Sequence, residues 1–176
     1  FQDLELELSN LNPLIKGGKE TMTFNQIFRD FLYQKLKDRG LSELNKKHIK
    51  AARIFGERGD LDALVRHASE AGDFGFAANS IQSAGGVRLF IRSGAPALAE
   101  LLKKIPQKNI ENAEELQLAR AVVLSKNGYL SEARAIVEET RANFTKSNKR
   151  ENLNSTILAD INHIDDLLQI YEDRDS

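Results

Sequence analysis

Three histidines, His48, His67 and His163, are the side chains of this sequence best suited to bind a metal ion. The sequence has no cysteine, so a zinc site would need at least two of these imidazoles together with carboxylates from distant helices. Asp160 and Asp166 lie near His163 at a spacing that could place two ligands on one helical face. Because carboxylates beside a histidine are also common on polar helices, we predict no metal site and expect His48 and His67 to pack or hydrogen-bond at helix contacts.

Two glycine-containing segments could bind an anion. Residues 16–21 read Lys-Gly-Gly-Lys-Glu-Thr and superficially resemble a phosphate loop, but Pro13 replaces the required first glycine and Glu20 stands where a serine or threonine would bind magnesium. Gly85 and Gly86 could present backbone amides to an anion at a helix start, or could form a tight bend between helices. We expect a hairpin tip at the first segment and a bend at the second.

The other polar residues do not indicate catalysis. No serine or threonine lies in a nucleophile-elbow or triad pattern, and the acidic residues fall at expected helix starts and on polar faces. The basic clusters at residues 46–50 and 146–150 have acidic neighbours and lack interleaved aromatic residues, and the net charge of the chain is -1. We expect a non-enzymatic segment with solvated basic clusters, no direct nucleic-acid contact and no cofactor of its own.

The composition is that of a folded domain outside the membrane. Of the 176 residues, 41% are hydrophobic and 29% are charged, so the chain can form both a core and a solvated surface. No stretch approaches the roughly 20 apolar residues of a membrane span, and the N-terminus lacks a signal-peptide pattern. The absence of cysteine agrees with a reducing compartment. We expect a cytoplasmic location, and the Leu-rich start without Met indicates a segment of a longer polypeptide.

The spacing of apolar residues predicts a β-hairpin and then a helix. Residues 11–24 contain two short apolar runs around a glycine pair, which tolerates the positive φ of a tight turn. From Phe24 the spacing becomes helical, and the helix ends at Gly40. Its apolar stripe comprises Phe24, Ile27, Phe28, Phe31, Leu32 and Leu36. We expect Phe28, Phe31 and, in the next helix, Phe55 to be core residues.

A series of further helices with short links follows. Polar residues are expected to cap the helix starts, and glycines to end the helices. The expected caps are Ser42, Asp60 and Asp73, and the expected stops are Gly59, Gly72 and the glycine pair at 85–86. An apolar stretch then stops at Gly94, and a helix runs from Pro96 to Pro106. Helices joined by such short links pack as antiparallel neighbours, which predicts an all-α fold.

Residues 112–144 predict a helix pair similar to a tetratricopeptide (TPR) unit. At residues 127–133 the sequence reads Asn-Gly-Tyr-Leu-Ser-Glu-Ala, in which the glycine forms the turn and small residues let the helices nest. After a polar link at residues 145–152, a last helix carries a stripe of Ile157, Ile161, Ile164, Leu168 and Tyr171. Because the terminal unit of a stacked array leaves an apolar face open, we expect this C-terminal helix to be able to self-associate.

Residues 23–32, Thr-Phe-Asn-Gln-Ile-Phe-Arg-Asp-Phe-Leu, together with Leu36, resemble the end of the winged-helix element in MalT-like regulators of the LuxR family, which belong to the STAND class of signal-transduction ATPases. Three further segments resemble the helical stretch that follows in that family, in the same order and at similar distances. They are Ala-Ala-Arg-Ile-Phe at 51–55, Ala-Leu-Val-Arg-His-Ala at 63–68 and Ala-Gly-Asp at 71–73. The resemblance covers residues 11–144.

This resemblance implies a division into the C-terminal end of a winged-helix element at residues 1–39, a helical arm at 40–106, and TPR-like repeats that begin a superhelical sensor array at 107–176. It also implies an ATP- or ADP-binding module before this segment and a helix-turn-helix after it in the parent protein. The partners of the segment would then be those domains and an unknown inducer or regulatory protein. In the family, the signal shifts an ADP-bound resting form to an ATP-bound, self-associating form that activates transcription.

The resemblance also singles out three site residues. Relatives commonly place a nucleotide-facing histidine just before the phenylalanine-containing helix, and this sequence has Asn25 there. An amide can donate to a phosphate but lacks the charge of a protonated imidazole. Arg29 and Asp30 lie on the polar side of the apolar stripe, and we expect them to contact the nucleotide module.

The sequence thus predicts a regulatory, effector-sensing and protein-interaction segment of an ATP-dependent transcription activator. The alternative is a free-standing TPR-like adaptor that mediates protein–protein interaction without an attached ATPase. A phosphate loop upstream and a helix-turn-helix downstream in the parent gene would separate the two hypotheses.

Overall fold

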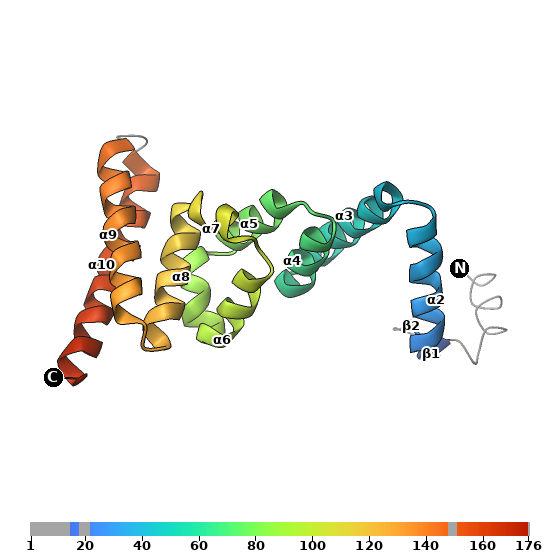
Figure 1. Ribbon diagram of the computed structural model, residues 1–176, viewed down its shortest axis with the longest axis horizontal. Helices are drawn as coiled ribbons and strands as arrows, with labels where there is room; N and C mark the ends of the chain where they lie inside the picture. The colour runs from blue at the N-terminus through green and yellow to red at the C-terminus, as the bar shows by residue number, and fades with distance from the viewer. Residues whose placement is uncertain (1–14, 18–21, 148–150, 176) are drawn as a thin grey trace. The chain divides into compact units, whose positions relative to one another are not determined.

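The computed structural model describes residues 15–17, 22–147 and 151–175 (Figure 1). The chain divides into two compact units, Phe1–Lys47 and His48–Ser176. A β-hairpin precedes a succession of helices, so the predicted all-α helical array is confirmed. Among the described residues, no helix combines the length and the apolar character needed to cross a membrane.

The described part of the first unit starts with the predicted hairpin. Strands β1 (Ile15–Gly17) and β2 (Met22–Phe24) pair antiparallel, with Ile15 opposite Phe24. The tip of the turn lies outside the described residues. Helix α2 (Gln26–Asp38) follows directly, and Asn25 caps it by accepting a hydrogen bond from the backbone N–H of Phe28 at 2.9 Å.

The apolar stripe of α2 is exposed, which corrects the expectation that it forms a core. No residue of α2 is buried. Ile27 is 81% exposed, Phe31 is 53% exposed, and Phe28 is half-buried. The Phe28 ring meets Phe24 edge to face at 5.4 Å and stacks with Phe31 at 6.4 Å. Of the described residues that precede α2, the two three-residue strands offer too little apolar surface to cover its stripe.

Helices α3 (Leu41–Glu57), α4 (Leu61–Glu70) and α5 (Phe74–Ser83) follow in the predicted order. Asp60 and Asp73 cap α4 and α5 as expected, each accepting a hydrogen bond at 3.0 Å from a backbone N–H three residues on. Ser42 is not a cap, because α3 already begins at Leu41 and the carbonyl of Gly40 accepts from the N–H of Glu43. Phe55 is partly buried against the core of the second unit.

Helix α6 (Leu89–Lys103) bends at the predicted breakpoint. Gly94 has φ 80° and ψ 166°, a backbone conformation that glycine alone adopts without strain, and it separates two helical pieces. A 3-10 turn, η1 (Gly86–Arg88), precedes α6, and a short helix that the sequence did not predict, α7 (Gln107–Glu111), follows it.

The C-terminal part consists of α8 (Glu114–Lys126), α9 (Leu130–Ser147) and α10 (Glu151–Asp175). Helix α8 packs against α6, α9 and α10, and α9 and α10 lie side by side (Figure 1). Because α8 has neighbours on several sides, it buries five apolar residues, namely Leu116, Leu118, Ala119, Ala121 and Val122. Helix α9 continues to Ser147 and α10 begins at Glu151, so both helices reach into the polar link predicted at residues 145–152.

The inward stripe of α10 is covered within the chain. Ile157, Ile161, Ile164 and Leu168 are all buried, and α10 contacts both α8 and α9. The face that we expected to be open is therefore not this stripe. Leu158 and Ile170 are the large apolar residues of the helix that are exposed among those described. Self-association through α10 stays a prediction.

Candidate functional site

The side-chain donor atoms of His48, His67 and Glu70 converge between α3 and α4; we call this group the histidine cluster. Nδ1 of His48 lies 2.9 Å from Nδ1 of His67 and 3.0 Å from Oε2 of Glu70. Nδ1 of His67 lies 3.6 Å from the same Glu70 oxygen. His67 and Glu70 share one face of α4 because they are three residues apart, whereas His48 comes from α3.

The histidine cluster is enclosed on its inner side and open at Glu70. The exposed fractions of the side chains are 9% for His48, 19% for His67 and 44% for Glu70. The ring of Phe55 stacks on that of His67, with 5.4 Å between centroids and 7° between planes. Packing thus restricts the imidazoles while the carboxylate can reach solvent. Both residue types, histidine and glutamate, bind protons and metal ions.

The surroundings of His67 favour its neutral form. Burial is the main cause that lowers the pKa of His67 from the ordinary value, and the charge of Arg66 and the neighbouring His48 lower it further. The Glu70 carboxylate acts in the opposite direction and does not cancel these effects. The unprotonated imidazole, which can act as an acceptor or a ligand, is therefore favoured near neutral pH.

The expectation that His48 and His67 hydrogen-bond at a helix contact is confirmed. The sequence did not indicate that Glu70 lies beside these two histidines. The spacing of His67 and Glu70 at i and i+3 was a signal for one half of the cluster. The pairing with His48, 19 residues from His67, depends on how α3 packs on α4.

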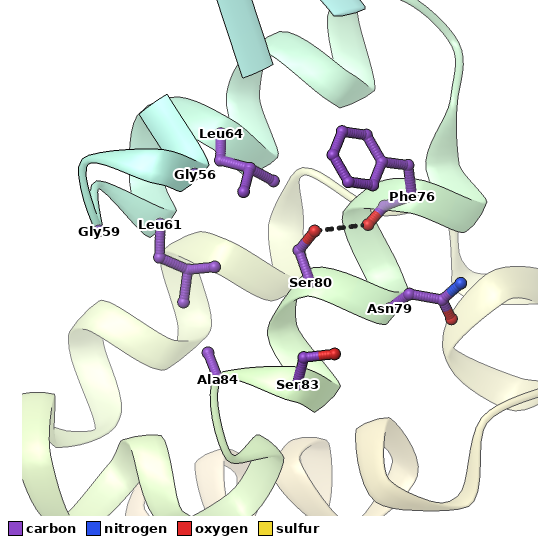
Figure 2. A pocket seen from close by; sticks show the side chains of 9 residues that line it. All are labelled: Gly56, Gly59, Leu61, Leu64, Phe76, Asn79, Ser80, Ser83 and Ala84. Atoms are coloured by element: carbon purple, nitrogen blue, oxygen red, sulfur yellow. Dashed lines mark hydrogen bonds between the residues drawn. The ribbon is translucent and has the colours of Figure 1, made fainter. Parts of the chain in front are cut away.

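A second candidate site is an apolar groove of about 380 Å³ beside the α3–α4 turn (Figure 2). Leu61 and Leu64 from α4 and Phe76 from α5 supply apolar surface, as Figure 2 shows. Asn79 and Ser83 add exposed polar groups from α5. An apolar floor with a polar edge suits the insertion of an apolar side chain or a small ligand with a few polar groups.

The hydroxyl of Ser80 also lines the groove but is engaged locally. It donates a hydrogen bond to the carbonyl oxygen of Phe76 at 2.8 Å, one turn earlier in α5 (Figure 2). The dashed line in Figure 2 marks this bond. The polar groups that Asn79 and Ser83 place at the edge are therefore better suited than Ser80 to contact a bound molecule.

The three site residues suggested by the family resemblance all lie on or next to α2. Asn25 uses its side-chain oxygen to cap the helix, which accounts for an amide at this position without a nucleotide. Arg29 and Asp30 form an ion pair, with 3.8 Å between Nε and Oδ1, and about two thirds of each side chain is exposed. The nucleotide-facing role of Asn25 and the interdomain role of the ion pair stay predictions.

His163 and its neighbouring carboxylates do not form a cluster of three ligands within the part of the chain that the structure describes. Asp160 lies 3.8 Å from Nε of Arg88, on η1. Burial raises the pKa of Asp160, although Arg88 and His163 both lower it. This carboxylate is therefore engaged with a cation from another element, and His163 and Asp166 are exposed.

The remaining candidates have structural roles where the structure describes them. Gly85 and Gly86 have φ values of 119° and 52° and form the bend before η1. Lys46 of the first basic cluster pairs with Glu43 at 2.8 Å on the surface. Residues 148–150 of the second basic cluster, like the tip of the glycine loop at residues 18–21, lie outside the described residues.

Comparison with known proteins gives one partial similarity. A stretch of 98 residues, 56% of the chain, is 32% identical to the serine/threonine-protein kinase PknK of Mycobacterium tuberculosis, and the PknK of Mycobacterium bovis matches equally. The matched stretch is only 9% of the length of these kinases. No protein-family model and no solved structure matches the chain.

The chain contains one triplet that is also a motif of kinases. Residues Asp73, Phe74 and Gly75 spell the Asp-Phe-Gly sequence in which kinases use the aspartate to bind magnesium. Here Asp73 caps α5, and its Oδ1 accepts from the N–H of Phe76 at 3.0 Å. Phe74 and Gly75 are the first residues of that helix. The triplet starts a helix and gives no support for phosphoryl transfer.

Proposed function

We propose that this chain is a non-catalytic regulatory and protein-interaction segment of a larger cytoplasmic signalling protein. Its parent is an ATP-dependent transcription activator of the MalT-like type that residues 11–144 resemble. The observation that carries this proposal is the exposed apolar stripe of α2, on the helix that the resemblance places at the end of a winged-helix element. An exposed stripe on an amphipathic helix is typical of a surface that packs on another domain.

The energetics of α2 favour such a contact. Burying a large apolar side chain stabilises a complex by about 1.5–3 kcal/mol, and Ile27 and Phe31 both have most of that surface available. The Arg29–Asp30 pair beside them is exposed, and an exposed ion pair contributes about 0–1 kcal/mol. Breaking this ion pair therefore costs little free energy, so both side chains can form new ion pairs with a neighbouring domain.

The effector is proposed to bind in the second unit, in the groove of Figure 2. Arrays of stacked helices bind partners through surfaces formed by several helices. Here α3, α4 and α5 all contribute to the groove, which has an apolar floor and polar groups at its edge. The similarity to a short part of PknK supports a segment that occurs inside larger signalling proteins.

The test uses the full-length parent protein. Isothermal titration measures its affinity for ATP and ADP with the natural sequence, with Arg29→Glu, and with Lys37→Glu as a control charge reversal at an exposed position of the same helix. We expect Arg29→Glu to change the ratio of ATP to ADP affinity by about tenfold, which corresponds to about 1.4 kcal/mol. Lys37→Glu should leave that ratio unchanged.

Two results would argue against the proposal. If Arg29→Glu and Lys37→Glu gave the same ratio as the natural protein, the ion pair would not lie at a nucleotide-dependent contact. If the full-length protein bound neither nucleotide, the ATP-dependent regulator would be excluded, and the free-standing TPR-like adaptor would be favoured.

A further inference from the structure

We propose that the histidine cluster binds a divalent transition-metal ion of the zinc class, with His48, His67 and Glu70 as its protein ligands. The three donor atoms come from two helices and converge within 4.8 Å of one another. The proposal does not depend on the regulatory function, because it concerns only the α3–α4 helix pair.

The spacing of the donor atoms matches that of ligands on one ion. Zinc bonds to nitrogen and oxygen of about 2.0–2.1 Å in tetrahedral geometry place neighbouring ligand atoms about 3.3 Å apart. The three separations in the cluster are 2.9, 3.0 and 3.6 Å. The circle through the atoms has a radius of about 1.9 Å, so an ion about 2.0 Å from all three lies just out of their plane.

The hydrogen bonds within this triangle depend on which imidazole carries a proton on Nδ1. A proton on Nδ1 of His48 can be shared between Nδ1 of His67 at 2.9 Å and the Glu70 oxygen at 3.0 Å. If Nδ1 of His67 carries it instead, His48 and Glu70 are two acceptors 3.0 Å apart. A cation, by contrast, accepts all three lone pairs at once.

The donor set decides the class of ion. Two imidazole nitrogens and one carboxylate oxygen suit zinc, cobalt, nickel or copper, whereas magnesium and calcium prefer oxygen ligands throughout. Because Glu70 is half-exposed, water can supply the fourth ligand from the solvent side.

An ion bound by residues of both helices would cross-link α3 and α4. Both imidazoles are more than four-fifths buried, and Phe55 restricts the ring of His67 by stacking on it. Packing thus holds the two imidazoles close to their binding geometry, and the exposed carboxylate of Glu70 is free to adjust. A ligand that binds the folded helix pair and not the unfolded chain raises stability by an amount that grows with the logarithm of its concentration relative to Kd.

The experiment uses the 176-residue protein without a histidine tag, freed of metal with a chelator and titrated with zinc chloride by calorimetry. Cobalt chloride gives a second readout, the visible absorption of tetrahedral Co²⁺. We expect a single site in the natural sequence, and a loss of affinity of more than about 100-fold in His48→Gln and His67→Gln. His163→Gln is the matched control, because His163 is exposed on α10 outside the cluster.

Circular dichroism of each metal-free variant separates lost binding from lost folding. Should a histidine variant unfold, Glu70→Gln tests the same site at an exposed position, and its affinity for zinc should fall at least about tenfold. The proposal is overturned if folded Glu70→Gln and the natural protein bind zinc equally, if the natural protein binds no zinc, or if His163→Gln abolishes binding.

Discussion

Gly56 of α3 and Leu64 of α4 approach so closely that a Cβ atom on Gly56 would lie 2.8 Å from Cδ1 of Leu64. Real Cβ atoms essentially never lie this close to another heavy atom, so a side chain at Gly56 would require the Cδ1 methyl group of Leu64, at the end of a flexible side chain, to move. Both residues line the apolar groove. The contact lies in the same helix pair that carries the histidine cluster.

Gly56→Ala is expected to change the free energy of unfolding by less than about 1 kcal/mol, because the gain in helix propensity offsets the cost of moving the Leu64 methyl group. In a Leu64→Ala background, where that methyl group is absent, the same change should stabilise the protein by about 1 kcal/mol. Urea denaturation of the natural protein, the two single variants and the double variant measures this difference. Equal effects in both backgrounds would contradict the contact.

Asp73→Ala is expected to lower the free energy of unfolding by about 1 kcal/mol, because the N–H of Phe76 loses its acceptor at the start of α5. Asp73→Asn keeps a side-chain oxygen at the cap and should cost only a few tenths of that. Chemical denaturation distinguishes the two variants. If Asp73→Asn lowered the free energy of unfolding as much as Asp73→Ala, the carboxylate charge and not the capping hydrogen bond would be what stabilises α5.

Ile164→Ala should destabilise the packing of α10 on its neighbours by about 2–5 kcal/mol, because the residue is fully buried and a cavity would remain. Leu158→Ala, on the exposed side of the same helix, should change stability by less than about 0.5 kcal/mol. Amide hydrogen exchange in α10 reports the local effect even if the rest of the chain stays folded. Similar exchange in both variants would show that α10 is not packed as described.

The metal-free protein is expected to lose stability as the pH falls below about 6.5. His67 has a lower pKa in the folded state than its ordinary value of 6.5, mainly because of burial, so the unfolded chain binds the proton more readily. The contribution of His67 is therefore fully present above that pH and decreases as the imidazole of the unfolded chain becomes charged. Asp160, whose pKa is raised, acts in the opposite sense and at more acidic pH.

Urea denaturation in the presence of a chelator, between about pH 7.5 and 5.5, checks this sign. His67→Gln should reduce the slope of stability against pH. If this variant kept the slope of the natural protein, the acid sensitivity would come from other groups.

The sequence alone determined most of the helices of this protein and where they start and stop. The caps at Asp60 and Asp73 and the break at Gly94 were predictable because each depends on atoms within a few residues along the chain. The apolar spacing also predicted the all-α class, since a helical period is a local property.

Only the tertiary structure decided which surfaces meet. The same kind of apolar stripe is exposed on α2 and buried on α10, because α10 has α8 and α9 beside it, whereas the described residues before α2 form only two short strands. The histidine cluster likewise required α3 to pack on α4, which brings His48 to residues that the chain places 19 or more positions away. Periodicity predicts that a face will be buried, but it does not contain the identity of the partner that covers it.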